Sequence, residues 1–375
     1  MKYFIIAGEA SGDLHGSYLV RALQKADPRA QFRFWGGAKM ARAIGREPEM
    51  HIDRLSIMGV WEVLKHLSDL RIQFKQCKAS LLEFRPDALI LIDFPGFNLR
   101  IAEWASKKGF NIQYYISPKL WAWNKKRVKA IKKYVDDLYV ILPFEADFYR
   151  PYGIEAHYVG NPLVEEIKEH LHACPERITR QKPIIALLPG SRAQEVRRIL
   201  PTLLDITGHY PDYHFVLAAI RTVPEAFYRS ILDRHPNGTS VEVLYDATYP
   251  ILQSARIGLI ASGTSTLEAA LMDLPQVVCY KTSPLTYFLA KTFLNIRYIS
   301  LVNLIMDAPV VPELIQNQLH PGRLRQEVDA LLADQTRRKQ QKIYRELSQK
   351  LGNHSSSTLV AEGVLHSIHS RRASN

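Results

Sequence analysis

Residues Gly258–Val278, GLIASGTSTLEAALMDLPQVV, predict a strand, a turn and a helix that lead directly into another strand. Ile257–Ala261 is a short apolar run, typical of a strand buried on both faces. Ser262–Thr266 forms the turn, Leu267–Met272 continues as a helix, and Gln276–Cys279 is the next buried strand. Alternation of this kind is typical of parallel α/β sheets covered by helices.

The turn at Ser262–Thr266 has the features of an anion site. The first N–H groups of a helix have no partner within it, and the helix dipole adds positive character there. Gly263 lets the backbone approach a phosphate closely. Glu268, one turn into the helix, would reach a ribose attached to that phosphate. Small polar residues also cap ordinary helices, so the turn alone leaves both interpretations open.

The same alternation runs through both halves of the chain. Val159-Gly160-Asn161-Pro162 interrupts it, and polar Glu165–Glu176 is interpreted as a loose connection. We therefore expect an α/β protein with two Rossmann-like parallel-sheet domains, 1–163 and 164–345, that face a cleft, followed by a C-terminal helical segment, 346–375. Strands are predicted at 3–7, 31–35, 88–92, 111–116, 138–142, 184–188, 214–219, 240–244, 257–261 and 276–279, and helices at 14–25, 39–45, 54–77, 195–210, 249–255 and 267–272.

Composition and motifs exclude several classes of protein. The chain has 375 residues, of which 47% are apolar and 23% charged, as in a folded protein of about two domains. Its three cysteines, Cys77, Cys174 and Cys279, fit neither a disulfide framework nor a metal site, and a reducing cytosol suits them. The sequence contains no P-loop, HExxH or GxSxG motif, and no GxGxxG follows the first predicted strand.

Two observations bear on membranes. The apolar run before Gly8 is too short for the core of a signal peptide. No apolar run approaches the roughly 20 residues that a spanning helix needs. The sequence therefore predicts a soluble or peripheral protein.

Carboxylates near the ends of predicted strands are candidates for a general base. Asp93 ends the strand Ala88–Ile92, at the sheet edge where open α/β sheets bind ligands. Glu9 and Asp13, in the turn after the first strand, are alternatives. Asp93 could instead cap a helix or turn. In the second half, Gly190-Ser191-Arg192 offers backbone donors and a guanidinium, which suit a diphosphate.

The chain has a net charge of +12, and its longest basic run is Lys119–Lys133, which contains seven lysines and arginines and no acidic residue. This run could contact nucleic acid, anionic lipid or a phosphorylated substrate, or it could be a solvated helix face. Arg54–Cys77 is predicted to be a long helix, and a core position is favoured because apolar residues extend beyond one face. The alternative exposes Ile57, Met58 and Trp61 to lipid.

Several motifs together resemble the lipid-A-disaccharide synthase family, glycosyltransferases of the GT-B fold. The resemblance runs from residue 1 to about residue 365, and the opening motif and the SPxLWAW segment are specific to it. The SGT…E element is shared with many nucleotide-sugar enzymes. The motifs are GEASGDLHG at 8–16, IDFPGFN at 92–98, SPKLWAW at 117–123, VGNP at 159–162, LPGSR at 188–192, SGT at 262–264 with Glu268, and SLVNLI at 300–305.

The resemblance implies an inverting transfer between UDP-diacylglucosamine and diacylglucosamine 1-phosphate, with no cofactor or metal. It implies a peripheral enzyme on the cytoplasmic face of the inner membrane of a Gram-negative bacterium. The C-terminal helices would pack back on the first domain, of the same chain or of a partner in a swapped homodimer. It assigns the base to Asp93. The remaining predicted contacts are Gly190, Ser191, Arg192, Ser262, Gly263, Thr264, Ser265, Glu268 and Asn303 for UDP, and Ile57, Met58, Trp61, Trp121, Lys125, Lys126 and Arg127 for acceptor and membrane.

Two other functions make different predictions. A UDP-sugar epimerase of the same fold needs no lipid surface, so Trp61, Trp121 and Trp123 would be buried. A nucleic-acid-binding protein would use Lys119–Lys133 and bind any DNA or RNA in a strongly salt-dependent way. That function gives no role to Asp93 or Glu268.

Overall fold

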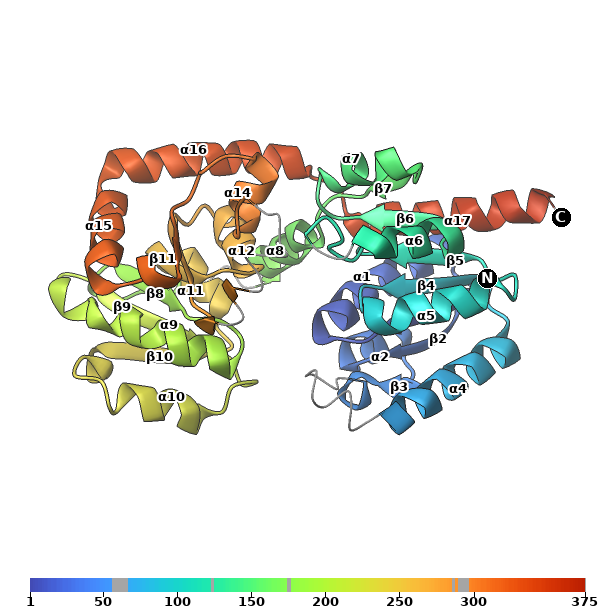
Figure 1. The fold of residues 1–375 in the computed structure, drawn as a ribbon, viewed down its shortest axis with the longest axis horizontal. Helices are drawn as coiled ribbons and strands as arrows, with labels where there is room; N and C mark the ends of the chain where they lie inside the picture. Colours follow the sequence, from blue (N-terminus) through green and yellow to red (C-terminus); the bar gives the residue numbers. More distant parts are fainter. Residues whose placement is uncertain (56–66, 123–124, 174–176, 285–286, 289–296, 375) are drawn as a thin grey trace. The chain divides into compact units, whose positions relative to one another are not determined.

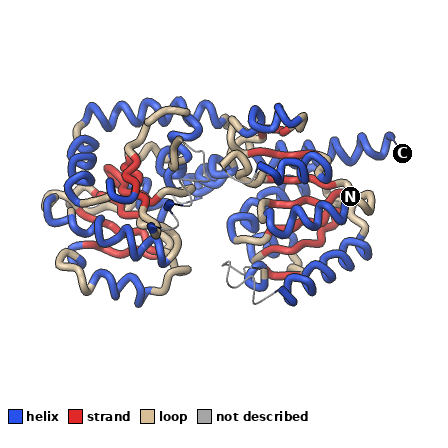
Figure 2. The backbone as a smooth tube through the Cα atoms, in the orientation of Figure 1, coloured by secondary structure: helices blue, strands red, loops and turns tan. Residues whose placement is uncertain are grey.

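The computed structural model describes residues 1–374 except 56–66, 123–124, 174–176, 285–286 and 289–296. The chain divides into two compact units, Met1–Glu165 with Asn353–Asn375, and Glu166–Gly352. Each unit is built around one fully parallel sheet, as Figure 2 shows by its red strands between blue helices. The prediction of two parallel-sheet α/β domains is therefore confirmed.

The first unit has a seven-stranded sheet in the order β3-β2-β1-β4-β5-β6-β7. Alternate residues of β1 enter different cores, because neighbouring side chains of a strand point to opposite faces: Phe4 and Ile6 lie on one side, and Tyr3 and Ile5 on the other. The elements, which can be followed in Figure 1, are β1 (Lys2–Ala7), α1 (Ala10–Ala26), β2 (Gln31–Gly36), α2 (Ala38–Ile44), β3 (Met50–His51), α4 (Leu67–Phe84), β4 (Ala88–Ile92), α5 (Pro95–Ser106), β5 (Ile112–Tyr115), α6 (Val128–Tyr134), β6 (Asp137–Val140), α7 (Glu145–Tyr149) and β7 (Ala156–Tyr158). Helix α8 (Pro162–Ala173) begins in this unit and continues into the second from Glu166.

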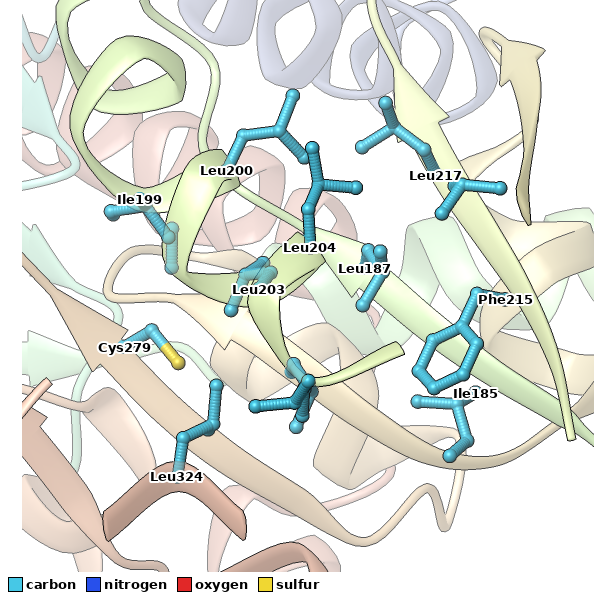
Figure 3. Packing of buried hydrophobic residues seen from close by; sticks show 14 of the residues in the cluster. Ile185, Leu187, Ile199, Leu200, Leu203, Leu204, Phe215, Leu217, Cys279 and Leu324 are labelled. Carbon is cyan, nitrogen blue, oxygen red and sulfur yellow. The ribbon is translucent and has the colours of Figure 1, made fainter. Parts of the chain in front are cut away.

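The second unit has a six-stranded sheet in the order β10-β9-β8-β11-β12-β13. Figure 3 shows one of its cores, where Leu200 and Leu204 of α9 lie close to Leu187 and Leu217 of the sheet. Its elements are β8 (Ile184–Leu188), α9 (Ala193–Asp205), β9 (His214–Ala219), α10 (Glu225–Leu232), β10 (Val241–Tyr245), α11 (Thr248–Ser254), β11 (Ala255–Ala261), α12 (Ser265–Leu271), β12 (Gln276–Tyr280), α14 (Leu301–Met306), β13 (Glu313–Ile315), α15 (Pro321–Leu332) and α16 (Asp334–Leu351).

The C-terminal helix α17 (Ser356–Ser374) belongs to the first unit. It packs against α1, and Val360, Val364 and Ile368 are buried in the core beneath it. The predicted return of the C-terminal segment to the first domain is thus confirmed for α17. Helix α16, however, runs without a break through residue 346 and stays with the second unit. The change of unit falls instead at Gly352, where this glycine ends the helix.

Two local predictions were wrong. The stretch predicted as a turn at 8–13 is already helix from Ala10, with Glu9 as its N-cap. Its Gly12 serves close packing, because a side-chain carbon there would lie 3.2 Å from Cβ of Ala7. The loose connection predicted at 165–176 is helix α8 up to Ala173. Pro162 begins this helix, since proline suits a first helical turn, and Leu163 and Ile167 are buried by it.

Candidate active site

Each sheet has one point where the strand order reverses direction. In the first unit this point lies between β1 and β4, and in the second between β8 and β11. Chains leave the carboxyl ends of two such strands toward opposite sides, which opens a crevice where doubly wound sheets bind their ligands. The four segments predicted as functional turns follow these four strands and lead into the next helix: Gly8–Asp13, Asp93–Asn98, Gly190–Arg192 and Ser262–Thr266.

The backbone of Asp93 is held in an unusual conformation directly after β4. Asp93 and Phe94 both have left-handed φ values, 44° and 48°, which are unfavourable for residues with side chains. Three hydrogen bonds fix Asp93: its N–H donates to the Tyr115 carbonyl (3.0 Å), and its carbonyl accepts from Asn98 Nδ2 and the Tyr114 hydroxyl (both 2.7 Å). The surrounding sheet therefore imposes the direction in which this carboxylate leaves the strand.

The electrostatic surroundings of Asp93 favour a base that works near neutral pH. Burial first, and then the charge of Glu9, raise the pKa of its carboxyl to about 6, while Lys119 and a backbone hydrogen bond from Phe94 oppose this shift. A carboxylate with a raised pKa holds a proton more strongly and still is ionised at pH 7. The structure thus brings Asp93 and Glu9, from the loops after β4 and β1, into one electrostatic environment.

Asp13 has a different surrounding. Its buried carboxylate accepts from the backbone N–H groups of Gly37 (2.7 Å), Lys39 (2.9 Å) and Met40 (3.1 Å). These are the donors around the start of α2, which have no partner within the helix. The role that these contacts support for Asp13 is structural, as the cap of α2. Glu9 is exposed at the start of α1, and no hydrogen bond from its side chain caps that helix.

In the second unit, the turn after β8 is organised by a residue that the sequence analysis did not select. Glu195 accepts from the N–H of Ser191 (3.0 Å) and from Arg192 Nη1 (3.4 Å). Gly190 has a φ of 115°, a region suited to glycine. A diphosphate bound at this turn would take both donors from Glu195. The guanidinium of Arg192 is well placed for such an exchange, because its side chain is 72% exposed.

The turn after β11 leaves room for a ligand. A side-chain carbon added at Gly263 would meet no atom of the described residues within 4 Å. The Ser262 hydroxyl donates to the Ile299 carbonyl (2.9 Å), and the Thr266 hydroxyl donates to the Gly263 carbonyl (2.8 Å). These two bonds fix the turn from inside and leave Gly263, Thr264 and Ser265 at the start of α12.

Glu268 lies in a pocket of about 340 Å³ beside this turn. Burial first, and then the nearby charge of Glu166, raise the pKa of its carboxyl to about 7, while a hydrogen bond with the Thr264 side chain opposes this shift. One wall comes from α8, where the His170 ring packs edge-on against Tyr249 (4.9 Å) and its buried Nε2 has no hydrogen-bond partner among the described residues. The residues that line the pocket are Glu166, His170, Asp246, Thr248, Tyr249, Pro250, Ser265 and Glu268.

The sequence analysis had missed the α8 wall of this pocket, since it placed Glu166 and His170 in a loose connection. The useful signal was the apolar spacing of Leu163, Val164 and Ile167, which indicates a helix. Nothing local in the sequence indicates that this helix faces the turn after β11.

The side-chain amide of Asn303 makes four hydrogen bonds within the second unit. Its Nδ2 donates to the Val311 carbonyl and to Glu313 Oε1, and its Oδ1 accepts from the N–H groups of Val310 and Val311, all at 2.9 Å. Among the described residues, both side-chain N–H donors of Asn303 thus have partners, and they fix the loop between α14 and β13. The contact of Asn303 with UDP stays a prediction.

The predicted acceptor and membrane residues are only partly described. Ile57, Met58, Trp61 and Trp123 lie outside the described residues, as does the side chain of Lys125. Trp121 is half-buried, and its Nε1 donates to Glu145 Oε1 (3.2 Å). Lys126 is exposed and Arg127 half-buried, just before α6. Within the described parts of the chain, no helix has the length and apolar character to cross a membrane.

Comparison with solved structures identifies the fold. A UDP-GlcNAc 2-epimerase from Neisseria meningitidis, solved with UDP-GlcNAc, aligns with a TM-score of 0.63 and 13% identity over 98% of this chain and 100% of its own. The glycotransferase of kitacinnamycin aligns with a TM-score of 0.64 and 15% identity over 98% of both chains. At these identities the likeness concerns the fold alone, and it agrees with the GT-B architecture of two parallel-sheet units.

Comparison of sequences is more specific. The profile of the family described as lipid-A-disaccharide synthetase matches residues 3–364. A lipid-A-disaccharide synthase from Trichlorobacter lovleyi is 39% identical over 341 residues, which cover 89% of this chain and 88% of the relative. One from Myxococcus xanthus is 36% identical, and the alignment covers 97% of each chain. A match of this extent includes both strand-order reversals and their loops, and this chain therefore belongs to the lipid-A-disaccharide synthetase family of glycosyltransferases.

Proposed function

We propose that the protein joins UDP-diacylglucosamine to diacylglucosamine 1-phosphate and forms the disaccharide 1-phosphate of lipid A and UDP. The observation that carries this proposal is the family match over residues 3–364. The half-buried carboxylate of Asp93, in the loop that the family resemblance assigns to the base, adds a chemical reason.

In the proposed reaction, Asp93 takes the proton from the attacking hydroxyl of the acceptor. The hydroxyl oxygen forms a bond to the anomeric carbon of the donor sugar as the bond from that carbon to the diphosphate breaks. A single displacement from the opposite face inverts the configuration at that carbon. The bonding electrons leave with UDP, and Asp93 retains the proton until solvent removes it.

The leaving diphosphate gains negative charge, so donors at its oxygens stabilise the transition state. We assign this role to Arg192 and to the backbone of Gly190–Arg192 and Ser262–Thr266, the loops at the strand-order reversal of the second unit. Glu268 would accept hydrogen bonds from the ribose hydroxyls. The ionised form accepts such bonds more strongly and at both oxygens, so ribose binding would favour loss of its proton.

The membrane contact that we propose combines apolar and basic residues on the cytoplasmic face of the inner membrane of a Gram-negative bacterium. Ile57, Met58 and Trp61 would enter the lipid, and the cations of Lys119–Lys133 would attract anionic headgroups. Co-sedimentation with anionic vesicles tests this. Binding should weaken in high salt and in a Met58→Ser, Trp61→Ser double variant. If neither change affects pelleting, the membrane contact lies elsewhere.

A swapped homodimer is a further part of the proposal. In this structure α17 packs on α1 of its own chain, after a four-residue connection, 352–355, that begins with Gly352 at the end of α16. The same α17 face would fit α1 of a second copy. Light scattering at several concentrations measures the oligomeric state. A mass of one chain at every concentration would contradict a swapped dimer.

The deciding experiment is incubation of the protein with UDP-diacylglucosamine and diacylglucosamine 1-phosphate, with mass spectrometry of the products. The proposal expects the disaccharide 1-phosphate and UDP in equal amounts. A parallel incubation with UDP-GlcNAc tests the epimerase alternative, which so far is a likeness of fold. Epimer without disaccharide would replace the proposed function with that one.

A further inference from the structure

The segment that leaves β5 beside Asp93 is held in place by a short helix from the next crossover. Ile116 turns the chain with a φ of 62°, and residues 117–122 then follow the carboxyl edge of the sheet. Helix α7 contacts this segment twice: the Tyr149 hydroxyl is 2.6 Å from Ser117 Oγ, and the Glu145 carboxylate accepts from Trp121 Nε1 (3.2 Å).

Glu145 is unusual because it is an acidic residue with only 1% of its surface exposed. Within the described residues no cation lies within ion-pair distance of it. Burial of an unpaired carboxylate is costly, and a neutral residue of similar shape would avoid that cost. The arrangement is thus better explained by what the carboxylate holds than by any gain in stability.

The two oxygens of Glu145 have separate partners. Oε2 accepts both local backbone donors, the N–H groups of Leu142 (2.9 Å) and Ile141 (3.2 Å), which follow the end of β6. An ordinary local cap would need only this oxygen. Oε1 is thereby left for the indole of Trp121, whose ring also packs edge-on against Phe144 (5.1 Å). The carboxylate therefore joins the end of β6 to the segment 117–122.

This segment lies close to the proposed base. The Asp93 N–H donates to the carbonyl of Tyr115 (3.0 Å), the last residue of β5, and the segment begins two residues later. The charge of Lys119 in this segment acts on the carboxyl groups of both Asp93 and Glu145. Trp121 is only half-buried, and the rest of its ring is available for contact. An indole presents a flat apolar face, which suits the ring and acyl chains of an amphiphilic sugar.

We propose that Glu145 is a positioning residue, which orients Trp121 so that its exposed face contacts the acceptor beside Asp93. The inference rests on the proposed function for the identity of the acceptor. The hydrogen bond between the two side chains can be tested without it.

The kinetic test compares Glu145→Gln, Trp121→Phe and the double variant. Glutamine keeps the shape, but its amide group turns a donor toward either the indole or the backbone N–H groups. Phenylalanine keeps a ring and removes the indole donor. Burial raises the pKa of Glu145 to about 7, so the assays are run at pH 8, where its carboxylate is ionised. Each single variant should then lower kcat/KM for the acceptor roughly tenfold to a hundredfold, as expected for loss of a hydrogen bond to a charged group. The effect should lie mainly in KM, and UDP affinity measured by calorimetry should be unchanged.

The double variant tests whether Glu145 acts through Trp121. If it does, the double loss should not exceed the larger single loss, whereas independent residues would give the product of both. Asp136→Asn is the matched control, because Asp136 also accepts a backbone N–H, that of Ile112 (2.7 Å), at the amino edge of the sheet. It should lower the melting temperature and leave the KM for the acceptor unchanged.

Quenching of tryptophan fluorescence by acrylamide tests the positioning without substrates. The contribution of Trp121 is obtained as the difference between wild type and Trp121→Phe, and the same difference is measured in the Glu145→Gln background. Quenching of Trp121 should increase when Glu145 is replaced. If Glu145→Gln does not melt cooperatively, Trp121→Phe leaves the contacts of Oε2 intact and is measured alone.

The outcomes separate this inference from the proposed function. A wild-type protein that forms no disaccharide overturns the function, and the fluorescence result then decides the positioning separately. Unchanged quenching in Glu145→Gln, or an unchanged KM for the acceptor in Trp121→Phe, overturns the role of Glu145. Fully multiplicative losses in the double variant overturn it as well.

Discussion

Asp93 in the first unit and Glu268 in the second are two carboxylates in matching places. Each lies beside the point where its sheet reverses strand order: Asp93 directly follows β4, and Glu268 is in α12, the helix that follows β11. Burial is the main cause that raises the pKa of each, to about 6 and about 7. Their backbones differ. Asp93 has a left-handed φ of 44° and three backbone hydrogen bonds that fix it, whereas Glu268 lies inside the regular helix α12.

The packing around the two carboxylates also differs: it is open at Glu268 and tight at Asp93. Glu268 borders a pocket of about 340 Å³ next to an uncrowded Gly263. Near Asp93 the packing is tight, and a side-chain carbon at Gly8 would collide with the Phe94 ring. A base must be held at a fixed direction to its proton, and backbone strain imposed by the sheet does this. A binding residue instead needs room for its ligand. With the roles that we propose for Asp93 and Glu268, the comparison teaches that one fold can build a rigid site and an open one at the same topological position.

The largest effect is expected on the reaction rate, when the proposed base in the first unit is replaced. Asp93→Asn should reduce the single-turnover rate by about 10²–10⁴-fold, the usual contribution of a general base. The amide keeps the size of the side chain, so UDP binding and the cooperative melt should be retained. Glu9→Gln is the control and should lose less than tenfold. A full loss in Glu9→Gln with little loss in Asp93→Asn would assign the base to Glu9.

The next largest effect is expected on UDP binding, when the carboxylate in the second unit is replaced. Glu268→Ala should weaken UDP binding by about 1–3 kcal/mol, the cost of losing hydrogen bonds to a charged group. Calorimetric titration with UDP measures this, and Asp93→Asn is the matched control, which should bind UDP as the wild type does. Equal UDP affinity in a folded Glu268→Ala variant would remove Glu268 from the nucleotide site.

A smaller effect concerns stability without ligand. Because the folded-state pKa of Glu268 is raised from 4.5 to about 7, its ionised form is less favourable in the folded protein than in the unfolded chain. This penalty is absent below pH 4.5 and complete above pH 7, so stability falls as pH rises between them. Glu268→Gln should therefore melt a few degrees higher than wild type at pH 8, and the difference should shrink toward pH 5.

Addition of UDP sharpens this measurement. Saturating UDP should stabilise the wild type more than Glu268→Gln at pH 8, which would reduce or reverse the difference in melting temperature. A variant that melts below the wild type at pH 8 without ligand would show that the carboxylate is not destabilising in its pocket.

The smallest effect is expected on the pH dependence of kcat/KM, when charged residues around Asp93 are replaced. Glu9 raises the pKa of Asp93 and Lys119 lowers it. Since the base works in its ionised form, the acidic limb of the kcat/KM profile follows this pKa. Glu9→Gln should move the limb to lower pH and Lys119→Met to higher pH, each by less than about one unit. Shifts in the same direction in both variants would contradict the charges assigned around Asp93.

Much of the fold could be predicted because its signals are local. The apolar runs Ala88–Ile92, Ile184–Leu188 and His214–Ala219 were predicted with the bounds that the structure has. Strands buried on both faces are short and nearly all apolar, and turns that contain glycine separate them from helices. The predicted start of a helix was wrong where a residue type that usually marks a turn or a break lies inside or at the start of the helix. Gly12 packs within α1 although glycine usually marks a turn, and Pro162 begins α8 although proline usually interrupts a pattern.

By itself, the sequence determined the alternation of elements, the two parallel sheets and the loops after strands that carry function. These follow from periodicity and turn chemistry, which act over a few residues. Only the tertiary structure decided which distant side chains become neighbours: His170 and Glu166 at Glu268, and Glu145 at Trp121. Parallel strands are joined by long crossovers, so residues far apart in the chain meet at one sheet edge. Burial at that edge then sets the pKa values that the chemistry requires, and no local pattern in the chain encodes burial of this kind.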